Sequence, residues 1–147
     1  MAYTINKTDG TIVATITDGT RSRTKHRLDL LLMKTAFVLG NGESRRGLKI
    51  TELKERGTVF ACNGVYRTDT PDYLIAVDPK MIFEICETGY QERNQVWSNY
   101  NAQYEKKANI RDHVRWFQPS LGWSSGPTAL RMAAEKGFDE IYILGFD

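Results

Sequence analysis

Short, nearly continuous apolar runs divide the chain from about residue 34 onward. Between them lie longer stretches in which apolar residues recur every three or four positions among charged ones. A continuous apolar run is typical of a strand buried on both faces of a parallel sheet, and the wider spacing is typical of an amphipathic helix. The predicted strands cover residues 36–39, 58–62, 73–77, 114–117 and 140–144.

The segments between these strands carry helix start signals. Asp78 is a good N-cap and Pro79 suits the first helical position, while Ser124 or Ser125 caps a later helix. The predicted helices cover residues 47–56, 79–87 and the stretch that ends before Gly137. Regular alternation of strand and helix indicates right-handed crossovers. We therefore expect an α/β fold over residues 33–147, a Rossmann-like three-layer domain with a mainly parallel sheet.

One long segment gives little secondary-structure signal. Residues 89–112 are polar and rich in asparagine, with four aromatic side chains scattered among them. We interpret this segment as a loop with a short helix, and a lid over a binding site is one role for it.

The first 32 residues are predicted to form a segment separate from the α/β domain. Residues 3–16 alternate threonine with apolar residues around Asp9-Gly10, which predicts a small N-terminal β-hairpin. A basic linker follows at 21–27, and Met33 would be a natural start for the α/β domain. The opening resembles the first residues of phage tail and other virion proteins. That resemblance implies a phage structural partner bound through residues 1–20 and an association with the virion.

Composition narrows the class of protein. The 147 residues suit one domain plus this leading piece, with no apolar run long enough to span a membrane and no secretory signal. The net charge of +2 comes from residues 1–32, and residues 33–147 hold 15 basic and 15 acidic side chains. A neutral body predicts no nucleic-acid partner. Cys62 and Cys86 read as two reduced thiols, so we expect a cytoplasmic protein. Assembly into a homo-oligomer is left open.

The stretch from residue 34 to 46 carries the main chemical signal. Its apolar run breaks into Gly40, Asn41 and Gly42 and then meets Ser44, a good N-cap. Two glycines allow a sharp turn and close approach to a ligand, and the N–H groups of a helix start favour an anion. A plain strand-to-helix connection is the alternative, because glycine and asparagine are common there too.

Polar residues recur where the other predicted strands end. The carboxyl ends of parallel strands meet at one edge of the sheet, which is where open α/β folds bind ligands. An asparagine amide both donates and accepts hydrogen bonds, which suits a base or a sugar hydroxyl. The residues expected at this edge are Asn41, Asn63, Asp78, Ser124, Ser125, Gly126 and Asp147.

These motifs carry a family resemblance. In their order along the chain, the segments 38–44, 60–63, 124–126 and 137–147 resemble bacterial sialyltransferases of the lipooligosaccharide type. They also resemble the related phage and bacterial proteins of the hydroxymethylpterin-diphosphokinase-like group. The first resemblance implies a domain that binds a nucleotide or nucleotide-sugar of the CMP-sugar kind, with sialyltransferase-type glycosyltransferase activity if it is active. It implies nucleotide contacts for Asn41, Gly42, Asn63, Ser124, Ser125 and Gly126.

The sequence leaves open whether the domain catalyses a reaction. In those transferases a histidine is the general base, and it follows the last motif matched here, whereas this chain holds only His26 and His113. The domain would then be an incomplete enzyme. The diphosphokinase-like relatives suggest a different chemistry, in which Asp78 and Asp147 hold Mg²⁺ between phosphates. A virion-associated interaction protein without catalysis is the third alternative.

Overall fold

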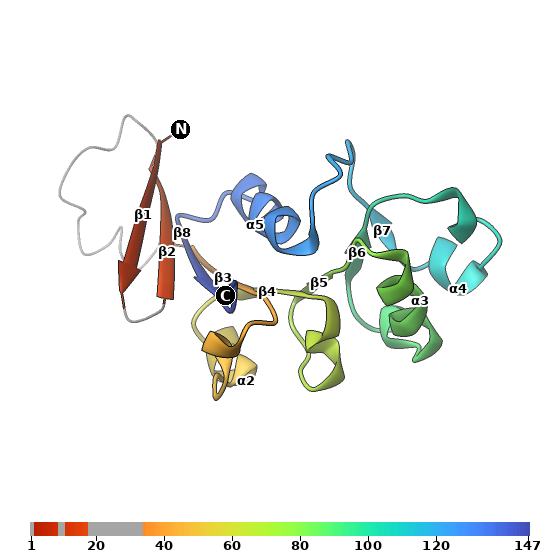
Figure 1. The fold of residues 1–147 in the computed structure, drawn as a ribbon, viewed down its shortest axis with the longest axis horizontal. Coiled ribbons are helices and arrows are strands. Elements are labelled where there is room, and N and C mark those ends of the chain that lie inside the picture. The colour runs from red at the N-terminus through yellow and green to blue at the C-terminus, as the bar shows by residue number, and fades with distance from the viewer. Residues whose placement is uncertain (1, 9–10, 18–33) are drawn as a thin grey trace.

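A computed structural model of the chain describes residues 2–8, 11–17 and 34–147, and one sheet runs through all of it (Figure 1). The eight strands are ordered β1-β2-β8-β3-β4-β5-β6-β7. They are β1 (Ala2–Thr8), β2 (Thr11–Thr17), β3 (Thr35–Leu39), β4 (Thr58–Cys62), β5 (Tyr73–Ile75), β6 (Val96–Ser98), β7 (Arg115–Trp116) and β8 (Glu140–Leu144). The helices are η1 (Glu43–Arg45), α2 (Ile50–Lys54), η2 (Asn63–Arg67), α3 (Pro79–Glu87), η3 (Tyr90–Glu92), η4 (Ala102–Tyr104), α4 (Ala108–Arg111) and α5 (Ser125–Glu135).

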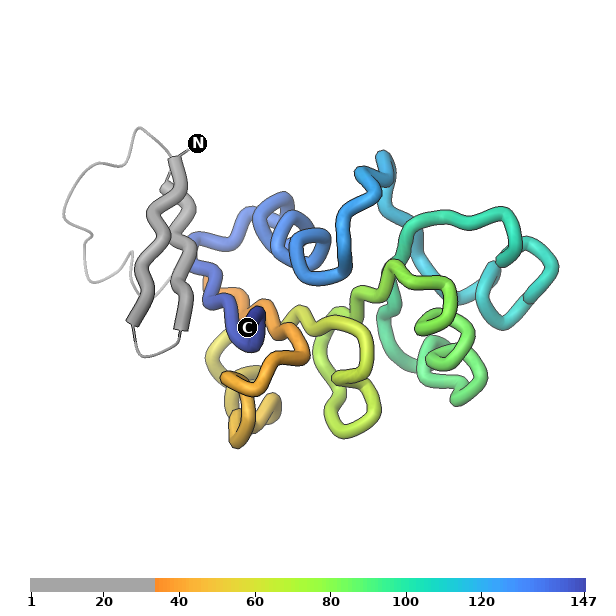
Figure 2. The backbone as a smooth tube through the Cα atoms, viewed as in Figure 1, coloured from red at the N-terminus to blue at the C-terminus, as the bar shows by residue number. Residues whose placement is uncertain are grey.

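The six strands from β8 to β7 are all parallel, which confirms the predicted Rossmann-like α/β fold. Helices α2 and α3 lie on one face of the sheet and α5 lies on the other (Figure 1). After β7, at the far edge, the chain returns through α5 to β8 beside β3, a course that Figure 2 shows. The strand order therefore reverses between β3 and β8, which makes that point the switch where such sheets bind ligands.

Strand β3 is buried on both faces, as its apolar run predicts. Ala36 and Val38 join the apolar cluster that α5 covers, whereas Phe37 and Leu39 join the cluster on the α2 side. All four side chains are buried. This two-sided burial explains why the strand reads as a continuous apolar run rather than an alternating one.

Residues 89–112 differ from the prediction. They contain strand β6, and Val96, Tyr104 and Ile110 are buried in a third cluster against α3. The segment is thus part of the core at the β6–β7 end of the sheet, and the lid interpretation is wrong. Strand β6 is only three residues long, too short for its single buried valine to give a recognisable pattern.

The main helix boundaries follow the predicted signals. Asp78 is the N-cap of α3 and its carboxylate accepts a hydrogen bond from the N–H of Lys80 at 2.9 Å, with Pro79 at the first helical position. Gly137, just beyond α5, has φ +81°, a conformation that glycine adopts without strain. The helix predicted over 47–56 is shorter than expected, because α2 spans only five residues. None of the described helices combines the length and apolar character needed to cross a membrane.

The predicted N-terminal hairpin is present. Strands β1 and β2 pair antiparallel from Ala2–Thr17 to Thr8–Thr11, and β2 pairs antiparallel with β8 at the edge of the sheet. The hairpin therefore extends the sheet beside the last parallel strand. The Asp9-Gly10 turn, the basic linker at 21–27, His26 and Met33 lie outside the described residues.

The aromatic packing beneath α5 gives the first testable prediction. Phe60 is fully buried, stacks on Tyr73 with ring centroids 4.8 Å apart and meets Phe138 edge to face. Replacing Phe60 with alanine removes these contacts and leaves a cavity, so we expect a loss of about 3–5 kcal/mol in the free energy of unfolding. Urea denaturation measures it. The control Trp123→Ala, at a side chain that is 47 % exposed, should cost about 0.5 kcal/mol or less. Equal losses in the two variants would contradict this assignment of the core.

Candidate functional site

A pocket of about 410 Å³ lies where β3, β4 and β8 end and α5 begins. Most of the residues that the sequence predicts at this edge meet in it, although they come from four separate parts of the chain. Ser44 and Ser125 lie behind its wall and contact residues that line it. The lining consists of Gly40, Asn41, Gly42, Cys62, Asn63, Ser124, Gly126, Pro127, Gly145, Phe146 and Asp147.

Asn63 is held in a fixed orientation at the end of β4. Its φ of 51° is in the left-handed region, which asparagine tolerates better than most residues. The Asn63 Oδ1 atom accepts a hydrogen bond from Ser125 Oγ at 2.9 Å. The Ser125 Oγ atom in turn accepts a hydrogen bond from the N–H of Val77 at 3.1 Å. Because Oδ1 is engaged, the Nδ2 group is the part of the amide left to donate to a ligand. Buried Ser125 therefore bridges α5, β4 and β5 rather than facing the pocket.

Asn41 uses its amide in the opposite way. Its Nδ2 group donates to the carbonyl oxygen of Cys62 at 3.2 Å, which ties the end of β3 to the end of β4. The Asn41 Oδ1 atom has no hydrogen-bond donor among the described residues. Asn41 is exposed, so this oxygen is the part of the amide that can accept a hydrogen bond from a ligand.

The glycines of the β3 turn (residues 40–42) make room for the β8 turn (residues 145–147). The N–H of Gly40 donates to the Leu144 carbonyl, and the N–H of Gly42 donates to the Gly145 carbonyl, both at 2.8 Å. A Cβ atom on Gly40 would overlap the Gly145 carbonyl oxygen and lie 2.9 Å from the Phe146 ring. The sequence indicated close approach to a ligand, but these glycines allow close approach of one turn to the other.

The anion position expected at Ser44 is filled by a carboxylate of the protein itself. Helix η1 spans only three residues and Gly42, not Ser44, precedes it, so the predicted N-cap role of Ser44 is wrong. The Ser44 N–H donates to Asp147 Oδ2 at 3.1 Å, and Ser44 Oγ donates to Asp147 Oδ1. The hydrogen bond from the Ser44 side chain, reinforced by backbone N–H groups, lowers the pKa of the Asp147 carboxyl group. Asp147 is therefore charged at neutral pH.

The start of α5 forms the opposite wall of the pocket. Ser124 is its N-cap but makes no side-chain capping bond, and in the described part of the chain the N–H groups of Ser125 and Gly126 have no partner. Phe146 lies over this helix start, since a Cβ atom on Gly126 would be 3.1 Å from its ring. The Phe146 side chain is 40 % exposed at the pocket. Phe146 was not among the predicted site residues, although the sequence places this aromatic residue two positions after the last strand.

Asp78, which was expected to bind a ligand or metal at this edge, lies away from this pocket, and so does His113. Asp78 follows β5, three strand positions from Asp147 after β8, which corresponds to about 14 Å across the sheet. The structure therefore does not bring these carboxylates together around one Mg²⁺, and among the described residues no cluster suits a metal ion. His113 is exposed between α4 and β7, at the far end of the sheet.

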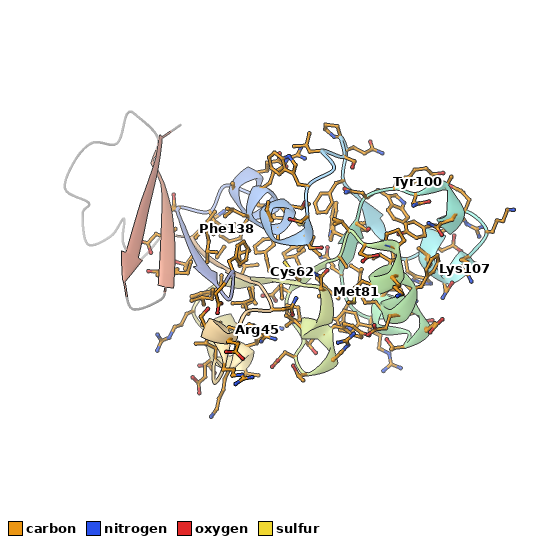
Figure 3. The ribbon with its side chains drawn as sticks, in the orientation of Figure 1. Arg45, Cys62, Met81, Tyr100, Lys107 and Phe138 are labelled. Atoms are coloured by element: carbon orange, nitrogen blue, oxygen red, sulfur yellow. The ribbon has the colours of Figure 1, made fainter. Side chains whose placement is uncertain are left out.

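The remaining titratable side chain of the pocket is a thiol. Cys62, labelled in Figure 3, belongs to the apolar cluster that α5 covers and is almost fully buried. Burial raises the pKa of the Cys62 thiol to about 12, so it stays protonated and is a poor nucleophile at neutral pH. The lining thus offers hydrogen-bonding groups, an aromatic ring and the carboxylate of Asp147.

Comparison with models of known protein families gives no match for this chain, and comparison with curated proteins gives none either.

The contact between the two turns can be tested at Gly42. Its φ of −67° and ψ of 160° suit any residue, but a Cβ atom there would overlap Asp147 Oδ1. We expect Gly42→Ala to lower the free energy of unfolding by about 1–3 kcal/mol, and by less when Asp147 is also replaced by alanine. The control Gly64→Ala meets only the flexible end of Arg67 and should be close to neutral. An equal cost in both backgrounds would show that Asp147 is not the obstacle.

The contact between Ser44 and Asp147 predicts a pH dependence. A carboxyl group whose pKa is lowered by folding stabilises the fold above its unfolded pKa, and this contribution is lost as the pH falls through the folded pKa. A carboxyl-carbon NMR titration should give Asp147 a pKa below the ordinary aspartate value. Ser44→Ala should raise that pKa, because the main hydrogen bond to the charged form is removed. An unchanged pKa in that variant would refute the assigned cause.

Proposed function

We propose that this domain binds a nucleotide or a nucleotide-sugar in the pocket at the β3–β8 switch point. The observation that carries the proposal is the meeting of four chain segments there. The turns after β3, β4 and β8 and the start of α5 surround one pocket, at the edge where open α/β sheets bind ligands. The resemblance of the same segments to sialyltransferase-like proteins favours a ligand of the CMP-sugar kind.

The groups left free in the pocket complement the parts of a nucleotide. The Asn63 Nδ2 group and the first N–H groups of α5 are donors, which suit phosphate oxygens. The Asn41 Oδ1 atom and the Asp147 carboxylate are acceptors, which suit ribose or sugar hydroxyls. The exposed ring of Phe146 lies between these groups and can contact the flat face of a base.

We propose ligand binding for this pocket and no group-transfer reaction. A general base has to reach the acceptor hydroxyl within hydrogen-bonding distance. No histidine lines the pocket in the described part of the chain, and the Asp147 carboxylate is engaged by Ser44. Diphosphoryl transfer between two Mg²⁺-binding carboxylates is not favoured, because Asp78 caps α3 through its own carboxylate.

Calorimetric titration of the full chain with CMP tests the proposal. Asn63→Gly keeps the left-handed backbone without strain but removes the amide donor, so we expect a roughly threefold to tenfold loss of affinity. The matched control is Asn99→Ala, which changes an asparagine just after β6, outside the pocket. Its affinity should equal that of the unaltered chain.

The alternatives give different results in the same experiment. An interaction protein without a ligand site would show no heat and no thermal stabilisation with CMP, UDP or ATP, with or without Mg²⁺. Binding of ATP only with Mg²⁺ would favour the diphosphokinase-like chemistry. Binding of CMP that Asn63→Gly leaves unchanged would place the nucleotide elsewhere on the molecule.

A further inference from the structure

The acidic side chain of Asp147 sets the charge of the candidate pocket among the residues that the structure describes. In the described part of the chain, its lining includes the Asp147 carboxylate but no lysine, arginine or histidine. Within the described residues, the ion pairs all involve other carboxylates, so no basic side chain forms a direct ion pair with Asp147. The pocket is also open to water, since both Asp147 and Phe146 are exposed. At the β3–β8 end a ligand therefore meets a carboxylate that has no direct ion-pair partner among the described residues.

The Asp147 carboxylate is also fixed in place. Both of its oxygens accept hydrogen bonds from Ser44, through the N–H group and the hydroxyl. It packs against the α-carbon of Gly42, where a side chain would overlap it. To leave this position, the carboxylate would have to give up both contacts, so an incoming anion cannot easily displace it.

We infer that Asp147 is a specificity-determining residue that selects the ligand by the ligand's charge. This inference rests on the proposed function. The ligand presents hydroxyl or amino hydrogens to Asp147 and Asn41 Oδ1, and its phosphate lies toward Asn63. Each further phosphate adds negative charge near a fixed carboxylate that forms no direct ion pair with a described basic residue. The site therefore favours nucleosides and nucleoside monophosphate groups over diphosphates and triphosphates.

Electrostatic repulsion predicts how strongly the site should prefer CMP over CDP. Two like charges several ångströms apart in a solvated pocket repel enough to change an affinity by roughly threefold to tenfold at low salt. Removing the charge of Asp147 should shrink the preference for CMP over CDP by about that factor. Affinity for cytidine should change far less through charge, because cytidine carries no phosphate. High salt should reduce the preference in the unaltered chain.

The test is a set of calorimetric titrations of the full chain with cytidine, CMP and CDP, without divalent metal and at low and high salt. Asp147→Asn keeps the size of the side chain and removes its charge. Glu43→Gln is the matched control, because it removes one negative charge from the neighbouring helix η1, where Glu43 is exposed and paired with Arg46. Far-UV circular dichroism establishes that each variant is folded. Ser44→Ala, which keeps the charge, serves as a second variant and should retain the preference for CMP.

The results separate the inference from the proposed function. A fall of at least threefold in the CDP-to-CMP ratio of dissociation constants in Asp147→Asn, absent in Glu43→Gln, supports the inference. An unchanged ratio, or equal changes in the two variants, overturns it while CMP binding still stands. Tighter binding of CDP than CMP by the unaltered chain overturns it as well. If none of the three compounds binds the folded chain, the proposed function fails and the inference fails with it.

Discussion

The close contact between the β3 turn and the β8 turn is the constraint on which the candidate site depends. Two backbone hydrogen bonds of 2.8 Å join the β3 turn to the last residue of β8 and to the β8 turn, and the absence of side chains on Gly40 and Gly42 lets the turns touch. The contact exists because β8 adds beside β3 after the chain has crossed the whole sheet. It places Phe146 and Asp147 opposite Asn41 and closes one side of the pocket. Without it, the switch point would be an open edge rather than a binding pocket.

Much of the fold could be predicted because its signals are local. The run at 36–39 reads as a buried strand because both of its faces pack against helices, and Asp78 with Pro79 fixes the start of α3 within the sequence itself. Strand β6 could not be predicted in this way. It is three residues long, and its place in the sheet comes from pairing with β5 and from the packing of Tyr104 and Ile110 against α3.

In the candidate site, too, the local features could be predicted from the sequence and the long-range contacts could not. Strand ends could be found from the sequence, so Asn41, Asn63 and Asp147 were expected at one edge, and the structure places them around one pocket. The contact between Ser44 and Asp147 spans 103 positions, and no local pattern encodes a contact of that kind. Ser44 was therefore interpreted as a free helix start, whereas its N–H and hydroxyl are already occupied by the protein's own carboxylate. The expected pair of Asp78 and Asp147 failed for a related reason, because strand order, which the sequence does not state, sets their separation.

The polarity of the pocket arises from how two asparagines share their amides with the protein. Asn63 turns its oxygen inward to Ser125, whose hydroxyl also serves the N–H of Val77, and so leaves a donor for the ligand. Asn41 turns its donor inward to the Cys62 carbonyl and leaves an acceptor. The two asparagines thus present opposite hydrogen-bonding groups at neighbouring strand ends, because each amide is oriented by a different partner. Asp147 adds to the acceptor side and the start of α5 to the donor side, so the pocket has a donor end and an acceptor end.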